Sequence, residues 1–454
     1  MNSRNNKMDL LGNTPIPKAL LAMGIPMMIG MMINALYNLV DAYFVGGLGT
    51  SQMGAISVVY PLGQVVVGLG LLFGNGAASY ISRLLGKGET ETANKVVSTA
   101  VYSSITAGAI IIIFSIIFLH PIVQLLGATK SIMPYAITYA NIYIISCIFN
   151  VFNVTMNNIV TSEGAAKISM CALMIGAITN IILDPLFIYT LNIGVAGAAI
   201  ATAISQIIST VVYFIYIFSG KSVFHFKIKD CCYSKEIMSE IFKIGVPTLV
   251  FQLLTSLSIS LINMQAKTYG DSLIAGMGAA TRIVSIGSLI VFGFIKGFQP
   301  IAGYSYGAKK FDRLHKAIKT SIIWSTIFCI MFGFILSIFS TGIISHFTVD
   351  DIEMIRLGAK SLTINGISFI LFGFYTVYSS LFLALGKGKE GFILGACRQG
   401  ICFIPVILIL PMIWGVNGIL YVQPIADILS AIITVFMALH LHKELEETKN
   451  KYSV

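Results

Sequence analysis

The chain has 454 residues, of which 56% are hydrophobic and only 11% are charged. Soluble globular domains carry about a quarter of charged residues, so this composition excludes a water-soluble protein. The formal net charge of +10 is spread over many separate short segments and forms no basic stripe with interleaved aromatic residues, so we expect no nucleic-acid partner.

Long apolar segments follow one another along almost the whole chain. A helix needs roughly 20 apolar residues to cross the hydrocarbon core of a bilayer. About twelve segments meet this requirement and predict an all-α membrane protein: 17–45, 53–82, 95–119, 133–160, 168–190, 195–219, 238–266, 274–304, 317–339, 357–384, 391–413 and 417–440.

The second half of the chain repeats the first. Gly24 aligns with Gly245 at an offset of 221 residues, and the same offset relates many further positions. We therefore expect an N-terminal six-helix lobe at 1–218, a cytoplasmic linker at 219–237 and a C-terminal six-helix lobe at 238–454. With six helices in each copy, the repeats are parallel, an arrangement typical of transporters with a substrate site at the repeat interface. Further matching pairs are Pro26 and Pro247, Phe73 and Phe294, Gly86 and Gly307, and Gly194 and Gly415.

The basic residues predict how the chain lies in the membrane. Lys and Arg in short loops stay on the cytoplasmic side. Most of the 29 Lys and Arg residues fall on one side if both termini are cytoplasmic, which predicts a multi-pass protein of the cell inner (plasma) membrane. The polar segment Met1–Leu11 precedes a long first helix without a small-residue cleavage pattern, so it does not resemble a removable signal peptide.

The sequence contains no motif for nucleotide hydrolysis. Gly220-Lys221-Ser222 matches the end of a phosphate-binding loop, but Ile215 occupies the position of the required earlier glycine. Transport would then be driven by an ion gradient or be passive, with no cofactor. No enzyme motif is present either, so we expect no enzymatic activity.

Two acidic residues lie within predicted spans of the first half. A charge inside a bilayer is costly and is by default a candidate functional group. Asp41 lies near the outer end of the first span and Asp184 near the outer end of the fifth, at matching depths. No Lys or Arg of this half lies at their depth, so one carboxylate must take up a proton or a metal cation, and their titrations are coupled. Sodium is a candidate metal here.

Amides and hydroxyls accompany both carboxylates at helical spacing. Residues three or four apart share one face of a helix. Such groups can line a site, or can serve only as hydrogen-bonding contacts between helices. The set comprises Asn34 and Asn38 with Asp41, Asn180 with Asp184, Asn150, Asn153 and Asn157 in the fourth span, and Thr202, Ser205 and Ser209 in the sixth.

Two prolines lie within the first and fifth spans. Proline removes one backbone hydrogen bond of a helix. Pro185 frees the carbonyl of Ile181, which could join a cation site, and Pro26 gives the first span a point at which it can bend. Both could equally be tolerated kinks.

These features together resemble the multidrug and toxic compound extrusion (MATE) family. The resemblance rests on two six-helix repeats, Gly24-x-Pro26 and its copy Gly245-x-Pro247, the 299–308 stretch that begins Gln299-Pro300, and Asp41 followed by Gly46-Gly47, and it covers nearly the whole chain. Within the family the chain is most similar to the branch of DNA-damage-inducible and staphylococcal-type multidrug exporters. That branch implies ion coupling by Asp41, Asn180, Asp184 and Thr202, with Asn157 lining the same cavity.

The resemblance further implies V-shaped lobes around a central cavity and export of amphipathic organic cations by antiport. Carboxylates attract cations, and tyrosines offer cation–π faces. We expect a monomer surrounded by membrane lipids. The predicted substrate-cavity residues are Asn34, Tyr37, Asn38, Tyr139, Asn153 and Asn157, and the predicted hinges are Pro26 and Pro185.

Other functions remain open at this point. A lipid-linked saccharide flippase of the same superfamily would need basic residues in its cavity to bind pyrophosphate, and a passive channel fits two asymmetric repeats poorly. The second bacterial branch of the family carries acids in spans seven and ten, where this chain offers only Asn365. We expect the charges of the C-terminal half, Arg282, Lys296, Arg398 and Asp427, to pair or to reach an interface rather than to contact substrate. The natural substrate and the choice between proton and sodium stay undetermined.

Overall fold

The protein is a bundle of long α-helices in a computed structural model that describes residues 2–346 and 351–452. Among these residues, eleven helices are long and apolar enough to cross a membrane, and a bent pair supplies a twelfth span. The predicted all-α membrane fold is confirmed. The ends of the spans differ from the predicted ends by a few residues, except that the last helix, predicted to end at 440, continues to Tyr452.

The first half folds into a group of helices that we call the N-lobe. Its six spans are α2, α3, α4, α6, α7 and α8, and a short helix, α1, precedes them. The elements are α1 (Asn2–Gly12), α2 (Ile16–Gly46), α3 (Thr50–Lys87), α4 (Thr90–Ile117), α5 (Leu119–Leu125), α6 (Met133–Ser162), α7 (Ala166–Pro185), a π-helical turn η1 (Leu186–Thr190) and α8 (Val195–Phe218).

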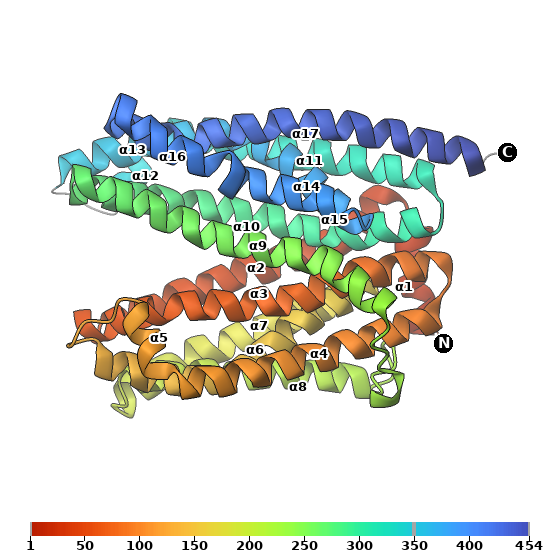
Figure 1. Ribbon diagram of the computed structural model, residues 1–454, viewed down its shortest axis with the longest axis horizontal. Helices are drawn as coiled ribbons and strands as arrows, with labels where there is room; N and C mark the ends of the chain where they lie inside the picture. Colours follow the sequence, from red (N-terminus) through yellow and green to blue (C-terminus); the bar gives the residue numbers. More distant parts are fainter. Residues whose placement is uncertain (1, 347–350, 453–454) are drawn as a thin grey trace.

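The second half forms the C-lobe, which a linker containing the short helix η2 (Ile228–Asp230) joins to the N-lobe. Both lobes begin on the side of the molecule that holds the two termini (Figure 1). The elements are α9 (Lys235–Ala266), η3 (Lys267–Tyr269), α10 (Asp271–Gly307), α11 (Phe311–Ile338), α12 (Ser340–Ser345), α13 (Ile352–Ser368), α14 (Ile370–Ala384), α15 (Gly388–Ala396), a π-helical turn η4 (Cys397–Ile401), α16 (Phe403–Trp414) and α17 (Val416–Tyr452).

The predicted tenth span is a broken helix. Its two parts, α13 and α14, meet at an angle of 51°. Sharp kinks occur at proline or at Gly and Ser pairs, and here Gly366 and Ser368 precede the break. The bend places the Ser368 hydroxyl 3.1 Å from the carboxylate of Asp427 on α17, so a side-chain contact fixes the bent geometry.

Glycines allow the two lobes to approach closely. A Cβ atom at Gly86 would lie 2.2 Å from the carbonyl oxygen of Tyr304, and a Cβ atom at Gly307 would lie 2.1 Å from the carbonyl oxygen of Arg83. Tyr304 and Arg83 are themselves related by the repeat offset, so the contact between α3 and α10 is reciprocal. Only glycine permits helix backbones to approach this closely.

The close contacts between lobes lie toward the termini. Gly245 on α9 meets Leu72 on α3, and Gly297 on α10 meets Gly24 on α2. Near the middle of α3, the Gln252 amide of α9 still donates to the Gln64 side chain, while Gly63 meets Tyr143 of its own lobe. Figure 1 agrees, since the ribbons of the lobes run together near the termini and diverge toward the opposite end. The described chain therefore forms the expected V shape, joined on the terminus side.

Candidate functional site: a carboxylate pair in the N-lobe

The two acidic residues of the predicted spans meet in the structure. Asp41 lies one to two turns before the end of α2, and Asp184 lies in the last turn of α7, beside the packed α2–α7 interface. Their carboxyl groups interact directly. Asp184 is completely buried, while Asp41 is partly exposed. The arrangement thus joins one carboxylate sealed in the lobe with one that solvent can reach.

Two further predicted residues complete this cluster. The Asn180 amide donates to Oδ1 of Asp184 and to the Thr202 hydroxyl on α8, at 3.5 Å in each case. Asn180 and Thr202 are both buried. The four residues predicted to handle the coupling ion therefore lie together, although they come from three helices.

Several oxygens of the cluster lack a donor. Oδ1 of Asp41, Oδ2 of Asp184 and Oδ1 of Asn180 are buried and accept no hydrogen bond from any described residue. Buried polar atoms are normally paired, because an unpaired one loses its hydration without compensation. All three are acceptors, so a proton, a water molecule or a cation would pair them. Carboxylate, amide and hydroxyl oxygens suit a hard cation such as sodium. The described residues hold no cluster of three or more His, Cys, Asp or Glu that would suit a multivalent metal.

Aromatic residues stand near the carboxylates. Tyr37 on α2 and Tyr139 on α6 both lie within electrostatic range of Asp41 and Asp184. Tyr139 is buried and stacks on Tyr143 with ring centroids 5.7 Å apart. An acidic pair with aromatic faces beside it can bind an organic cation by charge and by cation–π contact.

The remaining amides predicted for the cavity have different surroundings. Asn34 is partly buried and Asn38 is exposed, and the Asn38 amide donates to the Asn34 carbonyl at 2.7 Å. The Asn153 amide donates to the backbone and side chain of Gln206 on α8 at 2.8 and 2.9 Å. Asn153 therefore links α6 to α8. This is the interhelical hydrogen bonding that the sequence left open as an alternative role for these amides.

Both predicted hinge prolines lie inside helices. Pro26 is buried within α2, on the stretch that packs against α10. Pro185 ends α7 and leads directly into the π-helical turn η1. π-Helical turns are rare and occur frequently at functional sites. This one begins immediately after Asp184-Pro185, and the sequence pattern gave no sign of it.

The charges of the C-lobe are arranged partly as expected. Arg398 on η4 donates to Asp427 at 2.8 Å, and Asp427 also accepts from Ser368 and Gln423. The guanidinium lies over the ring of Phe372, 4.7 Å from its centroid. The expectation of mutual pairing is thus confirmed for Arg398 and Asp427.

Arg282 and Lys296, the other two basic residues considered in the C-terminal half, do not pair with an acid in the described structure. Arg282 is exposed. Lys296 crosses the interface and donates to Oδ1 of Asn157 in the N-lobe at 3.2 Å. Asn157 is buried and also donates to the Tyr213 hydroxyl at 3.3 Å. The sequence analysis did not predict this contact between lobes, because nothing in the sequence relates α10 to α6.

A small polar cavity lies beside this contact, between the lobes. Its volume is about 20 Å³, enough for one water molecule. Polar atoms from both lobes line it, including Ser79 and Asn158 from the N-lobe and Lys296 and Gln299 from the C-lobe. The terminus-side interface is therefore closed by polar as well as apolar contacts.

Two helix-bundle repeats, spans long enough for a bilayer and a buried acidic pair in one repeat are features of a multi-pass membrane transporter. The MatE family model matches residues 26–186 and 247–409, one stretch in each repeat. The chain belongs to the MatE family.

Individual relatives agree with this assignment. The chain is 32% identical over 441 residues to the multidrug export protein MepA of Staphylococcus aureus strain MRSA252, with 95% of each chain covered. It superposes with a TM-score of 0.92 on the crystal structure of MATE in complex with MaL6, at 26% identity over 97% of this chain and 99% of that one. An outward-facing multidrug resistance MATE family transporter of the MOP superfamily gives a TM-score of 0.91 at 26% identity, with 96% and 98% covered.

Proposed function

We propose that this chain is a cation-coupled antiporter that exports amphipathic organic cations by alternating access. The observation that carries the proposal is the set of buried acceptor oxygens on Asp41, Asp184 and Asn180 that have no donor. Acceptor oxygens beside two carboxylates suit a proton or a hard cation. Two relatives, a multidrug export protein and a multidrug resistance transporter, favour drugs as the exported class.

Competition for one negative charge is the proposed mechanism. When the pair is deprotonated and holds no metal ion, its charge attracts an organic cation, with Tyr37 and Tyr139 as aromatic contacts. A proton or a sodium ion that reaches the pair cancels the charge, and the organic cation leaves. Two ligands that weaken each other's binding in this way are thermodynamically linked, so the inward ion gradient can drive outward drug movement.

The transporter works as a monomer with both of its termini on the cytoplasmic side of the membrane. Both termini and the linker 219–237 lie in the cytoplasm, in the inner (plasma) membrane, because the basic loops lie on that side. The lobes at 1–218 and 238–454 rock against each other within a monomer surrounded by lipid. Because the lobes are joined on the terminus side, the described conformation faces outward. Pro26 and Pro185 act as hinges, and Asn34, Asn38, Asn153 and Asn157 contribute polar groups to the substrate path.

The alternative function is that of a flippase for lipid-linked saccharides. A pyrophosphate group would require basic side chains at the site, whereas the residues that meet at Asp41 and Asp184 are acidic, amide, hydroxyl or tyrosine. Lys296 is basic, but its ammonium bonds Asn157 in the closed interface. The charge of the site therefore favours an organic cation.

Efflux from vesicles tests the proposal. The purified chain is reconstituted with a fluorescent organic cation, and a proton gradient or a sodium gradient is imposed separately. Gradient-dependent movement of the dye with one of the two ions is expected and identifies the coupling ion. Movement of a fluorescent pyrophosphate lipid, with no dye movement under either gradient, would establish the flippase instead.

A further inference from the structure

Helix α1 lies at the end of the molecule where the lobes are joined (Figure 1). Its residue Leu11 is completely buried in a core cluster formed mainly by C-lobe side chains, and Met8 packs against the core clusters of both lobes. An 11-residue helix that precedes the first span therefore contacts both halves of the transporter.

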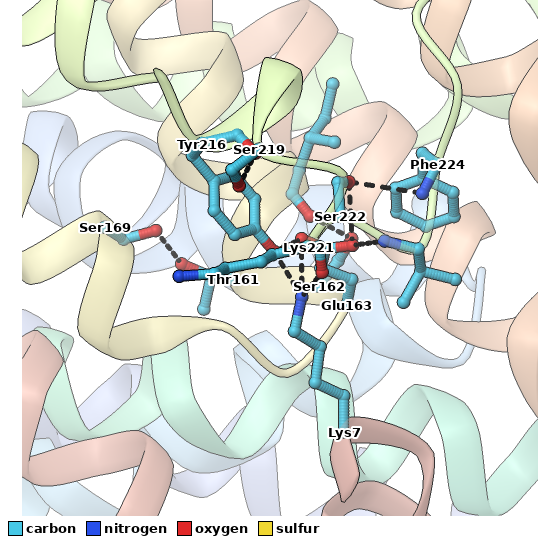
Figure 2. Close-up of polar contacts among 12 residues, drawn as sticks. Lys7, Thr161, Ser162, Glu163, Ser169, Tyr216, Ser219, Lys221, Ser222 and Phe224 are labelled. Atoms are coloured by element: carbon cyan, nitrogen blue, oxygen red, sulfur yellow. Dashed lines mark hydrogen bonds and ion pairs between the residues drawn. The ribbon is translucent and has the colours of Figure 1, made fainter. Parts of the chain in front are cut away.

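A buried polar cluster holds α1 to the N-lobe. The Lys7 ammonium donates to Glu163 at 3.4 Å, to the Lys221 carbonyl at 2.7 Å and to the Tyr216 hydroxyl. Glu163 is completely buried and also accepts from the Ser222 hydroxyl at 3.1 Å. Figure 2 shows these groups converging on the Glu163 carboxylate from α1, α8 and the linker. Together with the covalent connection to α2, this cluster fixes α1 on the N-lobe.

Two basic side chains of the C-lobe hold the other end of α1. Arg313 donates to the carbonyl of Leu11 at 3.0 and 3.1 Å and to that of Thr14 at 2.6 Å. Lys310 donates to the Gly12 carbonyl at 2.9 Å. The last carbonyls of a helix have no partner within the helix, and basic side chains at this end both pair them and favour the helix dipole. The C-lobe thus caps a helix that is anchored on the N-lobe.

These two attachments cannot both survive a separation of the lobes on this side. The N-lobe attachment has a buried carboxylate and a covalent link. The C-lobe attachment combines the buried side chain of Leu11 with hydrogen bonds from side chains at the start of α11 and just before it, where Lys310 is exposed.

We propose that α1 is a releasable strap. While the terminus side is closed, Arg313 and Lys310 of the C-lobe cap α1 and stabilise this closed conformation. When the lobes separate, these hydrogen bonds break and α1 stays attached to the N-lobe. This inference rests on the proposed alternating access and adds the element that sets how readily the terminus side opens.

A distance measurement between the lobes tests the strap without requiring transport. Spin labels are placed at Glu91→Cys on α4 and Lys389→Cys on α15, two exposed positions near the terminus side of opposite lobes, after replacement of the seven natural cysteines. Distances are compared for this labelled parent, for Lys310→Ala/Arg313→Ala and for Arg313→Lys, which keeps the charge but loses the fork of donors. Lys319→Ala, which removes an exposed lysine from the same helix, is the matched control.

The double variant should increase the population of long distances about tenfold over the labelled parent, as expected for loss of a set of charge-assisted hydrogen bonds. Arg313→Lys should give a smaller increase, and Lys319→Ala none. The remaining short-distance population reports that each variant is folded. The strap proposal would be overturned if the distance distribution were unchanged in both Lys310→Ala/Arg313→Ala and Arg313→Lys. It would also be overturned if Lys319→Ala increased the long-distance population as much as the double variant does. Because dye export is not the readout, a failure of the proposed function would appear only in the vesicle assay.

Discussion

Asp41 on α2 and Asp184 on α7 interact directly, yet each keeps one buried oxygen without a donor. Two carboxylates in such a position cannot both remain charged without a cation between them. The pair therefore behaves as one titrating unit, and replacing either member changes the behaviour of the other.

Asp41→Asn should abolish gradient-driven export and leave the fold intact. The amide keeps the shape of the carboxylate but neither titrates nor binds sodium by charge. The measurement is dye efflux from vesicles, with thermal unfolding of the purified variant as a check of folding. Near-normal efflux by a folded Asp41→Asn protein would contradict the role of Asp41 in coupling.

Asp184→Asn and Asp427→Asn form a matched pair of substitutions at buried acids. Asp184→Asn and, separately, Asn180→Ala should weaken ion coupling more than dye binding, because both residues belong to the proposed ion site. Asp427→Asn should leave coupling largely unchanged but lower the free energy of unfolding by about 3 kcal/mol, since it leaves Arg398 buried without its partner. Efflux and thermal unfolding of all three variants measure both effects. The coupling site would belong to the C-lobe if Asp427 proved essential for coupling and Asp184 dispensable.

Binding of a permanently charged dye should strengthen as pH rises. In the proposed mechanism protons and dye compete for the same negative charge, so the affinity should increase through the apparent titration of the pair and level off above it. Dye binding in detergent at a series of pH values measures this slope. In Asp41→Asn the slope should be much smaller. Equal slopes in the two proteins, or no slope in the parent, would mean that Asp41 does not link ion to drug.

Docking of α1 should depend on pH through Glu163. Burial raises the pKa of the Glu163 carboxyl, and Lys7 offsets only part of this effect. Among the groups that act on this pKa, Lys7 is the one on α1, and its positive charge lowers the pKa. A carboxyl group whose pKa is lowered on docking holds its proton less tightly in the docked state, so docking is favoured where Glu163 is charged and weakens as pH falls through the pKa of the docked state. Burial also lowers the pKa of Lys7, which affects only the alkaline range.

Hydrogen exchange of the α1 amides, corrected for the intrinsic pH dependence, measures this docking. Protection should fall as the pH is lowered from neutral into the acidic range in the parent and stay constant in Glu163→Gln. The same decline in both proteins would show that another group controls docking.

Gly245→Ala should disturb the closed interface. A Cβ atom there would lie 2.1 Å from the Leu72 carbonyl oxygen, so α9 must move away from α3. Overpacking of this kind costs about 1–3 kcal/mol. Gly278→Ala is the control, because nothing lies within 4 Å of its added Cβ atom, and it should be neutral or slightly stabilising. Thermal unfolding of both variants in detergent gives the comparison, and equal stability would contradict the tight approach of the lobes.

The sequence predicted the spans and the carboxylate cluster well because both depend on local patterns. Hydropathy and the repeat located the helices, and the spacing of Asn180 and Asp184 put both side chains on one helix face. The meeting of Asp184 with Asp41 followed from their matching depths. These inferences need only the geometry of single helices in a membrane.

What the sequence did not predict depends on how separate helices pack. The contact from Lys296 to Asn157 crosses the lobes, and the Glu163 cluster joins α1, α8 and the linker, which no periodic pattern relates. The break before α14 occurs without proline, and its geometry is fixed by the contact of Ser368 with Asp427 on a distant helix. The spacing of Asn153 placed it on the face of the site residues but did not predict its hydrogen bonds to Gln206 on α8.

The reciprocal contact of Gly86 with Tyr304 and of Gly307 with Arg83 has a historical consequence. Each half of the chain presents the same patch to the other, as the two subunits of a symmetric dimer do. A shorter ancestral chain with only one half would already have possessed a self-complementary face for pairing with its own copy. Fusion of the two copies then allowed them to diverge, and the acidic pair could persist in one half while the other lost any counterpart.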